Sequence, residues 1–174
     1  YRQGADRKWR QLREVGDVGR LDAWGDTVVL LTSASCEMST DAGVTWRTAS
    51  VQGFNLIMPG TERVVKTGPA TDTTIGLMIC EPFKNVCVQT VIPKQNPSYD
   101  LYVCKGLAAV VYRRADSVWM SLLSMPTMDT TTWRREERRI ASRPIDVVGA
   151  DGLAYLQDTM LVYIRTEGED TLHI

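Results

Sequence analysis

The sequence has few of the residues on which metal centres and nucleotide sites depend. It contains a single histidine, His173, and its four cysteines lack the paired spacing of zinc ligands. A glycine-rich loop of the phosphate-binding type is also missing. We therefore expect no metal ion and no cofactor. His173 lies next to the last residue, which makes it a poor candidate for the base of a serine hydrolase.

An excess of charge of either sign is missing too. The formal net charge is -1, with 24% of the 174 residues charged, so we expect no nucleic acid as partner. No apolar run reaches the roughly 18 residues of a membrane-spanning helix, so no span is expected in this segment. Residues 1–174 are interpreted as a single domain. Because the chain begins at Tyr1 and lacks a signal-peptide stretch, we expect a mature chain or a piece of a longer protein.

Short β-branched and apolar runs recur between turn signals such as PGTE, GPATD, RAD and GADG. This pattern predicts an all-β, antiparallel fold. Two charged segments, 6–15 and 133–141, repeat charges at i and i+4 as helices do, but each has a tryptophan that fits the start of a strand, and we interpret both as strands. The predicted strands are Asp26–Ala34, Thr74–Cys80, Val86–Ile92, Leu107–Arg114, Ser117–Met125, Gly152–Leu156 and Thr159–Thr166.

The segment STDAGVTW places small polar residues and a tryptophan at alternating positions: Ser39, Asp41, Gly43, Thr45 and Trp46. This pattern resembles the Asp box, or BNR repeat, of sialidases and other β-propellers. The resemblance implies a turn between the third and fourth strands of a propeller blade, with Ser39 and Asp41 bonding turn amides and Trp46 packed into the blade. The residue types suit that role, since short polar side chains satisfy turn amides and glycine accepts a positive φ.

Similar segments recur along the chain. PTMDTTTWRRE places Asp129, Thr132 and Trp133 in nearly the same relation, one residue shorter and without the glycine, and we interpret it as a degenerate box. Together with weaker echoes near Trp9, Cys87 and Leu172, the boxes are spaced by about 40 residues, the period of four-stranded blades. We therefore expect an antiparallel β-propeller, or part of one, with about four blade-sized repeats. Four units indicate a piece of a longer chain, blades that another subunit supplies, or an unusually small ring, and of these we favour the incomplete piece of a larger propeller.

The resemblance to sialidases implies, for the catalytic members, three arginines that bind the substrate carboxylate. It also implies a tyrosine nucleophile aided by a glutamate, and an aspartate that acts as acid and base. The segment nearest to the first arginine motif, Ser142–Asp146, lacks its aromatic and apolar residues. The tyrosines in strand-like runs fit packing better than catalysis. No catalytic residue is assigned.

Two further groups of residues are candidates for specific roles. Arg134, Arg135, Arg138 and Arg139 surround two glutamates and are candidates for binding an acidic ligand, although a solvated strand with balanced charges explains them as well. Cys80 and Cys87 flank a short turn and are candidates for a disulfide in an oxidising compartment; in a reducing one they would be free thiols.

These observations favour a non-catalytic Asp-box β-propeller module that binds a glycan or a protein partner. Two alternatives stay open: a fragment of a sialidase-like glycoside hydrolase, and a structural subunit of a larger assembly that docks through its open sheet edge. We expect a secreted or cell-surface location.

Overall fold

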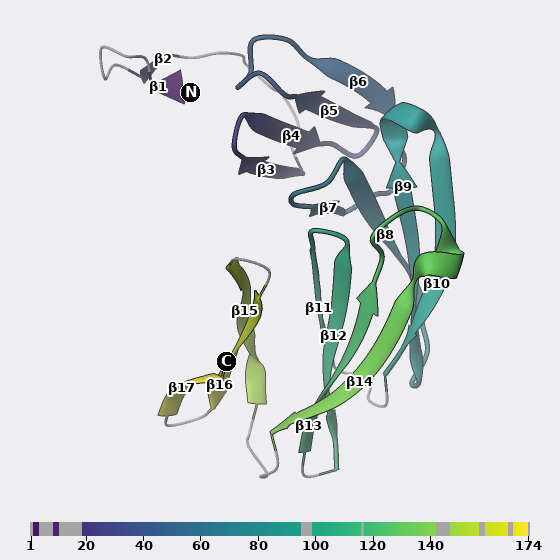
Figure 1. Ribbon diagram of the computed structural model, residues 1–174, viewed down its shortest axis with the longest axis vertical. Coiled ribbons are helices and arrows are strands. Elements are labelled where there is room, and N and C mark those ends of the chain that lie inside the picture. Colours follow the sequence, from purple (N-terminus) through teal and green to yellow (C-terminus); the bar gives the residue numbers. More distant parts are fainter. Residues whose placement is uncertain are drawn as a thin grey trace. The chain divides into compact units, whose positions relative to one another are not determined.

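A computed structural model describes most of the chain. It covers the backbone of residues 2–3, 9–10, 19–94, 99–115, 117–141, 147–156, 159–166 and 169–173, and the side chains of 19–94, 99–115 and 117–140. The regular structure of these residues is antiparallel β-strand, apart from two single-turn 3₁₀ helices (Figure 1). The predicted all-β, antiparallel class is confirmed.

Three four-stranded sheets form the main part of the described structure, and in each one every strand pairs with the next along the chain. The first sheet consists of β3 (Arg20–Trp24), β4 (Thr27–Leu31), β5 (Ser35–Ser39) and β6 (Arg47–Ser50). The second consists of β7 (Leu56–Met58), β8 (Arg63–Ala70), β9 (Thr74–Glu81) and β10 (Val86–Pro93). The third consists of β11 (Tyr99–Cys104), β12 (Leu107–Arg114), β13 (Ser117–Ser124) and β14 (Arg134–Ala141).

Shorter pairings lie at both ends of the chain. Strands β15 (Val147–Leu156), β16 (Thr159–Thr166) and β17 (Glu169–His173) form a three-stranded antiparallel sheet in chain order. Strands β1 (Arg2–Gln3) and β2 (Trp9–Arg10) pair with each other. The remaining residues of segment 6–15, and segment Ser142–Asp146, lie outside the described residues.

The strand predictions hold well for runs of apolar and β-branched residues that turn signals bound. Strand β12 has the bounds expected from the sequence, and β9, β10, β13 and β16 agree with theirs to within one residue. The charged segment that ends at Ala141 is strand β14, as we interpreted it. Tight turns join these strands: Lys105 and Gly106 both have positive φ, 42° and 76°, which suits a two-residue hairpin turn with the twist of the flanking strands.

Two predicted turns were wrong in part. Residues Gly68 to Ala70 of GPATD belong to strand β8, and only the residues after them turn. Pro69 lies beyond the part of β8 that pairs with β7, which is Arg63 to Val65. The segment GADG is likewise part of strand β15 and does not form a turn. The pairing register between β15 and β16 shifts within this segment.

The chain divides into two compact units. Unit one comprises Tyr1–Thr67 and Met78–Val88, and unit two comprises Gly68–Leu77 and Gln89–Ile174. Unit one has a core that includes Val29, Leu31, Met38, Ile57 and Cys80. Unit two has a separate cluster formed by Ala109, Val111, Val118 and Met120. Each core is built from the alternating inward positions of the sheets, as antiparallel sheets require.

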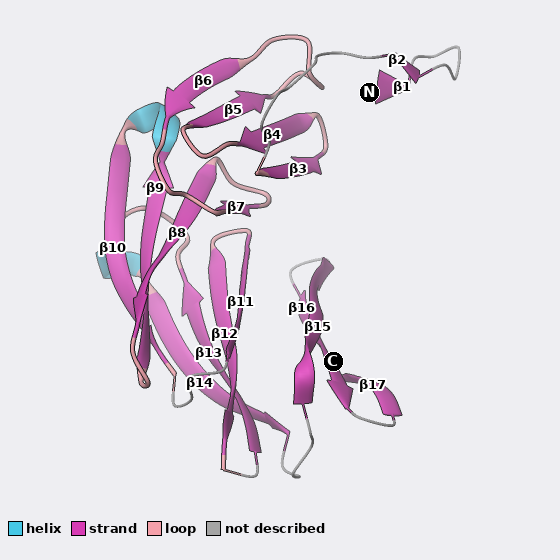
Figure 2. Ribbon diagram, turned by 180° about the vertical axis from the view of Figure 1, so that it is seen from behind, coloured by secondary structure: helices cyan, strands magenta, loops and turns pink. Residues whose placement is uncertain are grey.

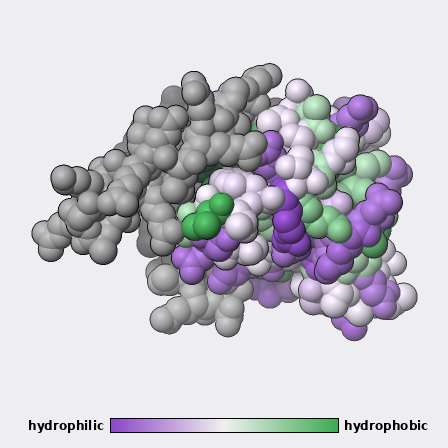
Figure 3. All heavy atoms as spheres, turned by 90° about the horizontal axis from the view of Figure 1, so that it is seen from above, coloured by the Kyte–Doolittle hydropathy of each residue, from purple (hydrophilic) through white to green (hydrophobic). Residues whose placement is uncertain are grey.

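Hydrophilic and weakly hydrophobic residues are interspersed over the described part of the face in Figure 3. Four large hydrophobic side chains are exposed in the described part of the chain: Leu21, Val44, Val86 and Val91. Within the described residues, no helix has the length and apolar character to cross a membrane.

Candidate functional site

The turn from β5 to β6 is held by two short polar side chains. The Ser39 hydroxyl accepts a hydrogen bond from the Gly43 amide at 2.7 Å and donates one to Asp41 Oδ1 at 2.7 Å. Asp41 Oδ1 also accepts from the amides of Val44 and Thr45, at 3.1 and 2.8 Å, and Asp41 Oδ2 accepts from the Thr45 hydroxyl at 2.6 Å. One serine and one aspartate thus satisfy several amides that a tight turn would leave unpaired.

The other box residues complete this turn. Gly43 has φ 88°, a conformation that favours glycine. The Trp46 indole N–H donates to the Gly43 carbonyl at 3.0 Å, which fixes the ring against the turn. The hydrogen bonds from the Thr45 hydroxyl, the Thr45 amide and the Ser39 hydroxyl lower the pKa of Asp41 to about 2. Asp41 is therefore a carboxylate at neutral pH and serves as an acceptor, not as an acid.

A shorter version of the same turn joins β13 to β14. Asp129 Oδ1 accepts from the amide and the hydroxyl of Thr131, at 2.9 and 2.7 Å, which lowers the pKa of Asp129. The Trp133 indole N–H donates to the Thr127 carbonyl at 2.8 Å. Thr132, which the sequence suggested as the box threonine, instead donates its hydroxyl to the Asp129 carbonyl at 2.7 Å. The shorter loop moves the threonine that faces the carboxylate from position 132 to 131.

Sequence reasoning missed Thr127, although a signal for it was present. Thr127 precedes Asp129 by two residues, as Ser39 precedes Asp41. Its hydroxyl accepts from the Asp129 amide at 3.1 Å, as the Ser39 hydroxyl accepts from the Asp41 amide at 3.4 Å. The two turns therefore share three elements: a hydroxyl two residues before the aspartate, a threonine bonded to the carboxylate, and a bonded indole.

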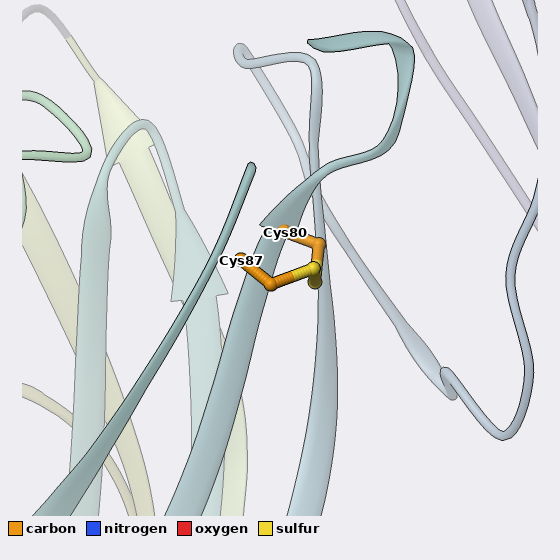
Figure 4. The surroundings of a disulfide bond; sticks show 2 residues. All are labelled: Cys80 and Cys87. Carbon is orange, nitrogen blue, oxygen red and sulfur yellow. A yellow bond between two sulfur atoms is a disulfide. The ribbon is translucent and has the colours of Figure 1, made fainter. Parts of the chain in front are cut away.

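The second sheet has a different turn in the same place. A 3₁₀ turn, η1 (Pro82–Lys84), joins β9 to β10, and a second, η2 (Thr130–Thr132), lies in the β13–β14 connection (Figure 2). A disulfide joins Cys80 and Cys87, whose side chains point toward each other from β9 and β10 (Figure 4). The disulfide spans the turn in the position where the other two sheets have the turns of Asp41 and Asp129.

Charged side chains surround this disulfide-bonded turn in unit one. Arg63 and Lys84 lie 3.3 and 2.9 Å from the Glu81 carboxylate. Burial alone would raise the pKa of Glu81, but the hydrogen bonds from Lys84 and Arg63 lower it below its usual value. Arg47, the residue after the box tryptophan, lies over the Phe83 ring at 4.5 Å and pairs with Glu62 at 3.0 Å. These contacts are complete pairs, so they stabilise the turn and leave no charge poised for chemistry.

The arginines of β14 do not form one cluster. Successive side chains of a strand point to opposite faces, so Arg135 and Arg139 lie on one face and Arg134 and Arg138 on the other. Arg138 is held by Glu136, with N–O distances of 2.6 and 2.9 Å. Arg135 donates to the Thr90 hydroxyl of β10 at 2.9 Å. The sequence suggested that these four arginines form one binding group, but the alternation of side chains along β14 places them on two opposite faces.

A small cavity in unit two lies against Arg135. It has a volume of about 230 Å³ and lies between the end of β10 and strands β13 and β14. Of the four arginines proposed for ligand binding, only Arg135 borders it. The lining residues are Ile92, Pro93, Ser121, Leu122, Leu123, Arg135, Glu136 and Glu137.

A tyrosine–glutamate pair lies next to this cavity. Tyr112 on β12 is 2% exposed, and its hydroxyl donates to Oε1 of Glu137. Burial, and next the hydrogen bond to Glu137, raises the pKa of Tyr112 above its usual value. Tyr112 is therefore a neutral phenol at physiological pH. The pair was not evident in the sequence because 25 positions separate the two residues.

The remaining chemistry-bearing groups of the described residues are dispersed. No group of three or more histidine, cysteine, aspartate or glutamate side chains is placed to hold a metal ion in the part of the chain that the structure describes. Cys36 is a buried free thiol, and burial raises its pKa to about 11, which keeps it unreactive at neutral pH.

Comparison with protein-family models, with curated proteins and with solved structures finds no match to this chain.

Proposed function

We propose that this chain is part of an Asp-box β-propeller and that it binds a glycan or a protein partner without catalysing a reaction on it. The observation that carries the proposal is the position of the box turns. Both the turn of Asp41 and that of Asp129 connect the third and fourth strands of a four-stranded antiparallel sheet in chain order. A four-stranded sheet of this kind forms one blade of a propeller. The resemblance to Asp-box proteins implies a box at the connection between the third and fourth strands of a blade.

The contacts between neighbouring sheets support the same architecture. In unit one, first strand β3 of one sheet lies against first strand β7 of the next. In unit two, first strand β11 likewise lies against first strand β15, and fourth strand β14 bonds fourth strand β10 through Arg135 and Thr90. These contacts join the first strands or the fourth strands of consecutive sheets, and β7 also lies against the second strand β4. Blades that stack face to face around a common axis make these contacts.

The protonation states of the described side chains favour binding over catalysis. Asp41, Asp129 and Glu136 have lowered pKa values because hydrogen bonds stabilise their charged forms. A carboxyl group that acts as a general acid at neutral pH needs a raised pKa. A tyrosine or cysteine nucleophile needs a lowered pKa, and the pKa values of Tyr112 and Cys36 are both raised.

The alternative, a fragment of a sialidase-like glycoside hydrolase, has one observation in its favour. Tyr112 and Glu137 form a hydrogen-bonded pair, which is the combination that the resemblance implies for the nucleophile. Two properties of Tyr112 weigh against that role. Its side chain is buried in the sheet, and its pKa is raised, so the phenolate that would attack is disfavoured.

A secreted or cell-surface location is part of this proposal. The disulfide between Cys80 and Cys87 supports it, because such bonds persist outside the reducing cytosol. An extracellular module is also in reach of glycans and of the ectodomains of other proteins.

The decisive test pairs a turnover assay with a binding assay on the same protein. The full-length protein that contains this chain is incubated with a fluorogenic sialoside and is applied to a glycan array and to an array of extracellular proteins. We expect binding without turnover. Turnover that is lost in Tyr112→Phe would replace the proposal with the hydrolase alternative. Absence of both binding and turnover, with assembly into large oligomers, would replace it with the structural-subunit alternative.

A further inference from the structure

The cavity between β10 and the third sheet has the size of a small-molecule site. Its volume of about 230 Å³ is below the range of about 300 to 1,000 Å³ that is usual for drug-sized ligands. It therefore excludes an oligosaccharide or a folded peptide and admits one small molecule. Its apolar lining consists of Ile92, Pro93, Leu122 and Leu123, so the part of the ligand that enters deepest is aliphatic.

Polar groups border this apolar lining at two adjacent places. Ser121 lies opposite Glu137 in the pairing of β13 with β14, and Leu123 lies opposite Arg135. Ser121 is only 4% exposed, and its hydroxyl interacts with the phenol of the buried Tyr112. A hydroxyl has one donor and two acceptor positions, so Ser121 can bond a polar ligand group in the cavity in addition to Tyr112.

The two charged groups have bonding capacity left. Arg135 donates one hydrogen bond, to Thr90, and a guanidinium has five N–H donors. Glu137 accepts from Tyr112 on one of its two carboxylate oxygens. The two residues lie on the same face of β14 and are separated by one residue, which places their backbone positions about 7 Å apart. A positive and a negative group thus border one small apolar cavity.

We propose that this cavity binds a small aliphatic zwitterion, of which a free α-amino acid with a branched aliphatic side chain is the simplest example. The ligand carboxylate pairs with Arg135, its ammonium group pairs with Glu137 and Ser121, and its side chain contacts Ile92 and Leu123. This inference goes beyond the proposed function, because it concerns a small molecule that binds whether the large partner is a glycan or a protein.

Calorimetric titration of the full chain with L-leucine tests the proposal. We expect saturable binding of one leucine per chain. Binding of 4-methylpentanoate, which lacks the ammonium group, and of 3-methylbutylamine, which lacks the carboxylate, should be weaker by about tenfold or more, since each loses one charge-assisted pair.

Two variants locate the binding. Arg135→Gln should weaken leucine binding by about tenfold or more. Arg134→Gln is the matched control, because Arg134 is the adjacent arginine on the opposite face of β14, and it should leave binding unchanged. Both positions are exposed, and circular dichroism checks that both variants fold.

Three results would overturn the proposal. The first is the absence of saturable leucine binding by the folded wild-type chain. The second is equal loss of binding in the Arg134 and Arg135 variants. The third is equally tight binding of N-acetyl-leucine amide, which carries neither charge and would show that the cavity takes a leucine side chain of a protein. None of these results depends on the glycan or protein arrays, so the two proposals fail independently.

Discussion

Thr45 donates two hydrogen bonds to Asp41, from its amide at 2.8 Å and from its hydroxyl at 2.6 Å. Thr131 makes the same two bonds to Asp129, at 2.9 and 2.7 Å, although it follows its aspartate by two residues and not by four. The pairing of one carboxylate with both donors of a threonine is therefore retained when the loop shortens. This pairing is the feature that the two turns share most closely.

Removal of the Asp41 carboxylate should destabilise the first sheet. Asp41→Ala removes the carboxylate that accepts from the amide and the hydroxyl of Thr45, so we expect a lower melting temperature by differential scanning calorimetry. Asp72→Ala is the matched control, because Asp72 is an exposed turn aspartate of the β8–β9 hairpin. Surface changes of that kind alter stability by about 0.5 kcal/mol or less. Equal effects of the two substitutions would contradict the structural role of the box.

Asp41 should also contribute to the loss of stability in acid. Its pKa is about 2 in the folded chain, against about 3.9 for an unperturbed aspartate. Because the folded value is the lower one, the contribution is complete above about pH 4 and is lost as the pH falls toward 2. Urea unfolding at a series of pH values should show a shallower acid limb for Asp41→Asn than for wild type. An Asp41 carboxyl that titrates near its usual value by NMR would refute this prediction.

The disulfide should stabilise the turn between β9 and β10. Cys87→Ser opens a loop of eight residues, Cys80 to Cys87, for which chain-entropy arguments give a loss of about 2 to 3 kcal/mol in the free energy of unfolding. Cys104→Ser, which removes a free thiol, is the control and should change stability less. Chemical denaturation measures both. A reductant should lower the stability of wild type to that of the Cys87 variant and leave the variant unaffected; any other pattern argues against the bond.

Two leucines test the burial pattern of the first sheet. Leu31 is 2% exposed and belongs to the core of unit one, so Leu31→Ala should cost about 2 to 5 kcal/mol of unfolding free energy. Leu21 on the neighbouring strand is 61% exposed, and Leu21→Ala should change it by about 0.5 kcal/mol or less. The difference is measured by urea denaturation. A large cost at Leu21 would indicate that another part of the protein covers this side chain.

The parts of the fold that could be predicted from the sequence depend on local interactions. The side-chain hydrogen bonds that shape the Asp41 turn join residues between Ser39 and Trp46, so the pattern of residue types was enough to find it. Strand β12 was predicted with its bounds because it is an uninterrupted run of strand-forming residues. Strand β8 was not, because Gly68 and Pro69 indicate a turn unless the pairing of the neighbouring strand is known.

The candidate cavity could not be predicted because it depends on contacts between distant segments. Arg135 and Thr90 are 45 positions apart, and Tyr112 and Glu137 are 25 apart. The sequence indicated that arginines are dense on β14, but it gave no reason to prefer Arg135 over its neighbours. That choice follows from strand alternation and from the position of β10, which only the structure supplies.

A crystal structure of the full-length protein that contains this chain is the most direct test of the account. We expect its four-stranded sheets to be arranged radially around a common axis, with the first strands β3, β7 and β11 nearest the axis and the turns of Asp41 and Asp129 at equivalent positions on the rim. Sheets packed as a two-layer sandwich, or turns of Asp41 and Asp129 at unrelated positions, would contradict the proposal that this chain is part of an Asp-box β-propeller.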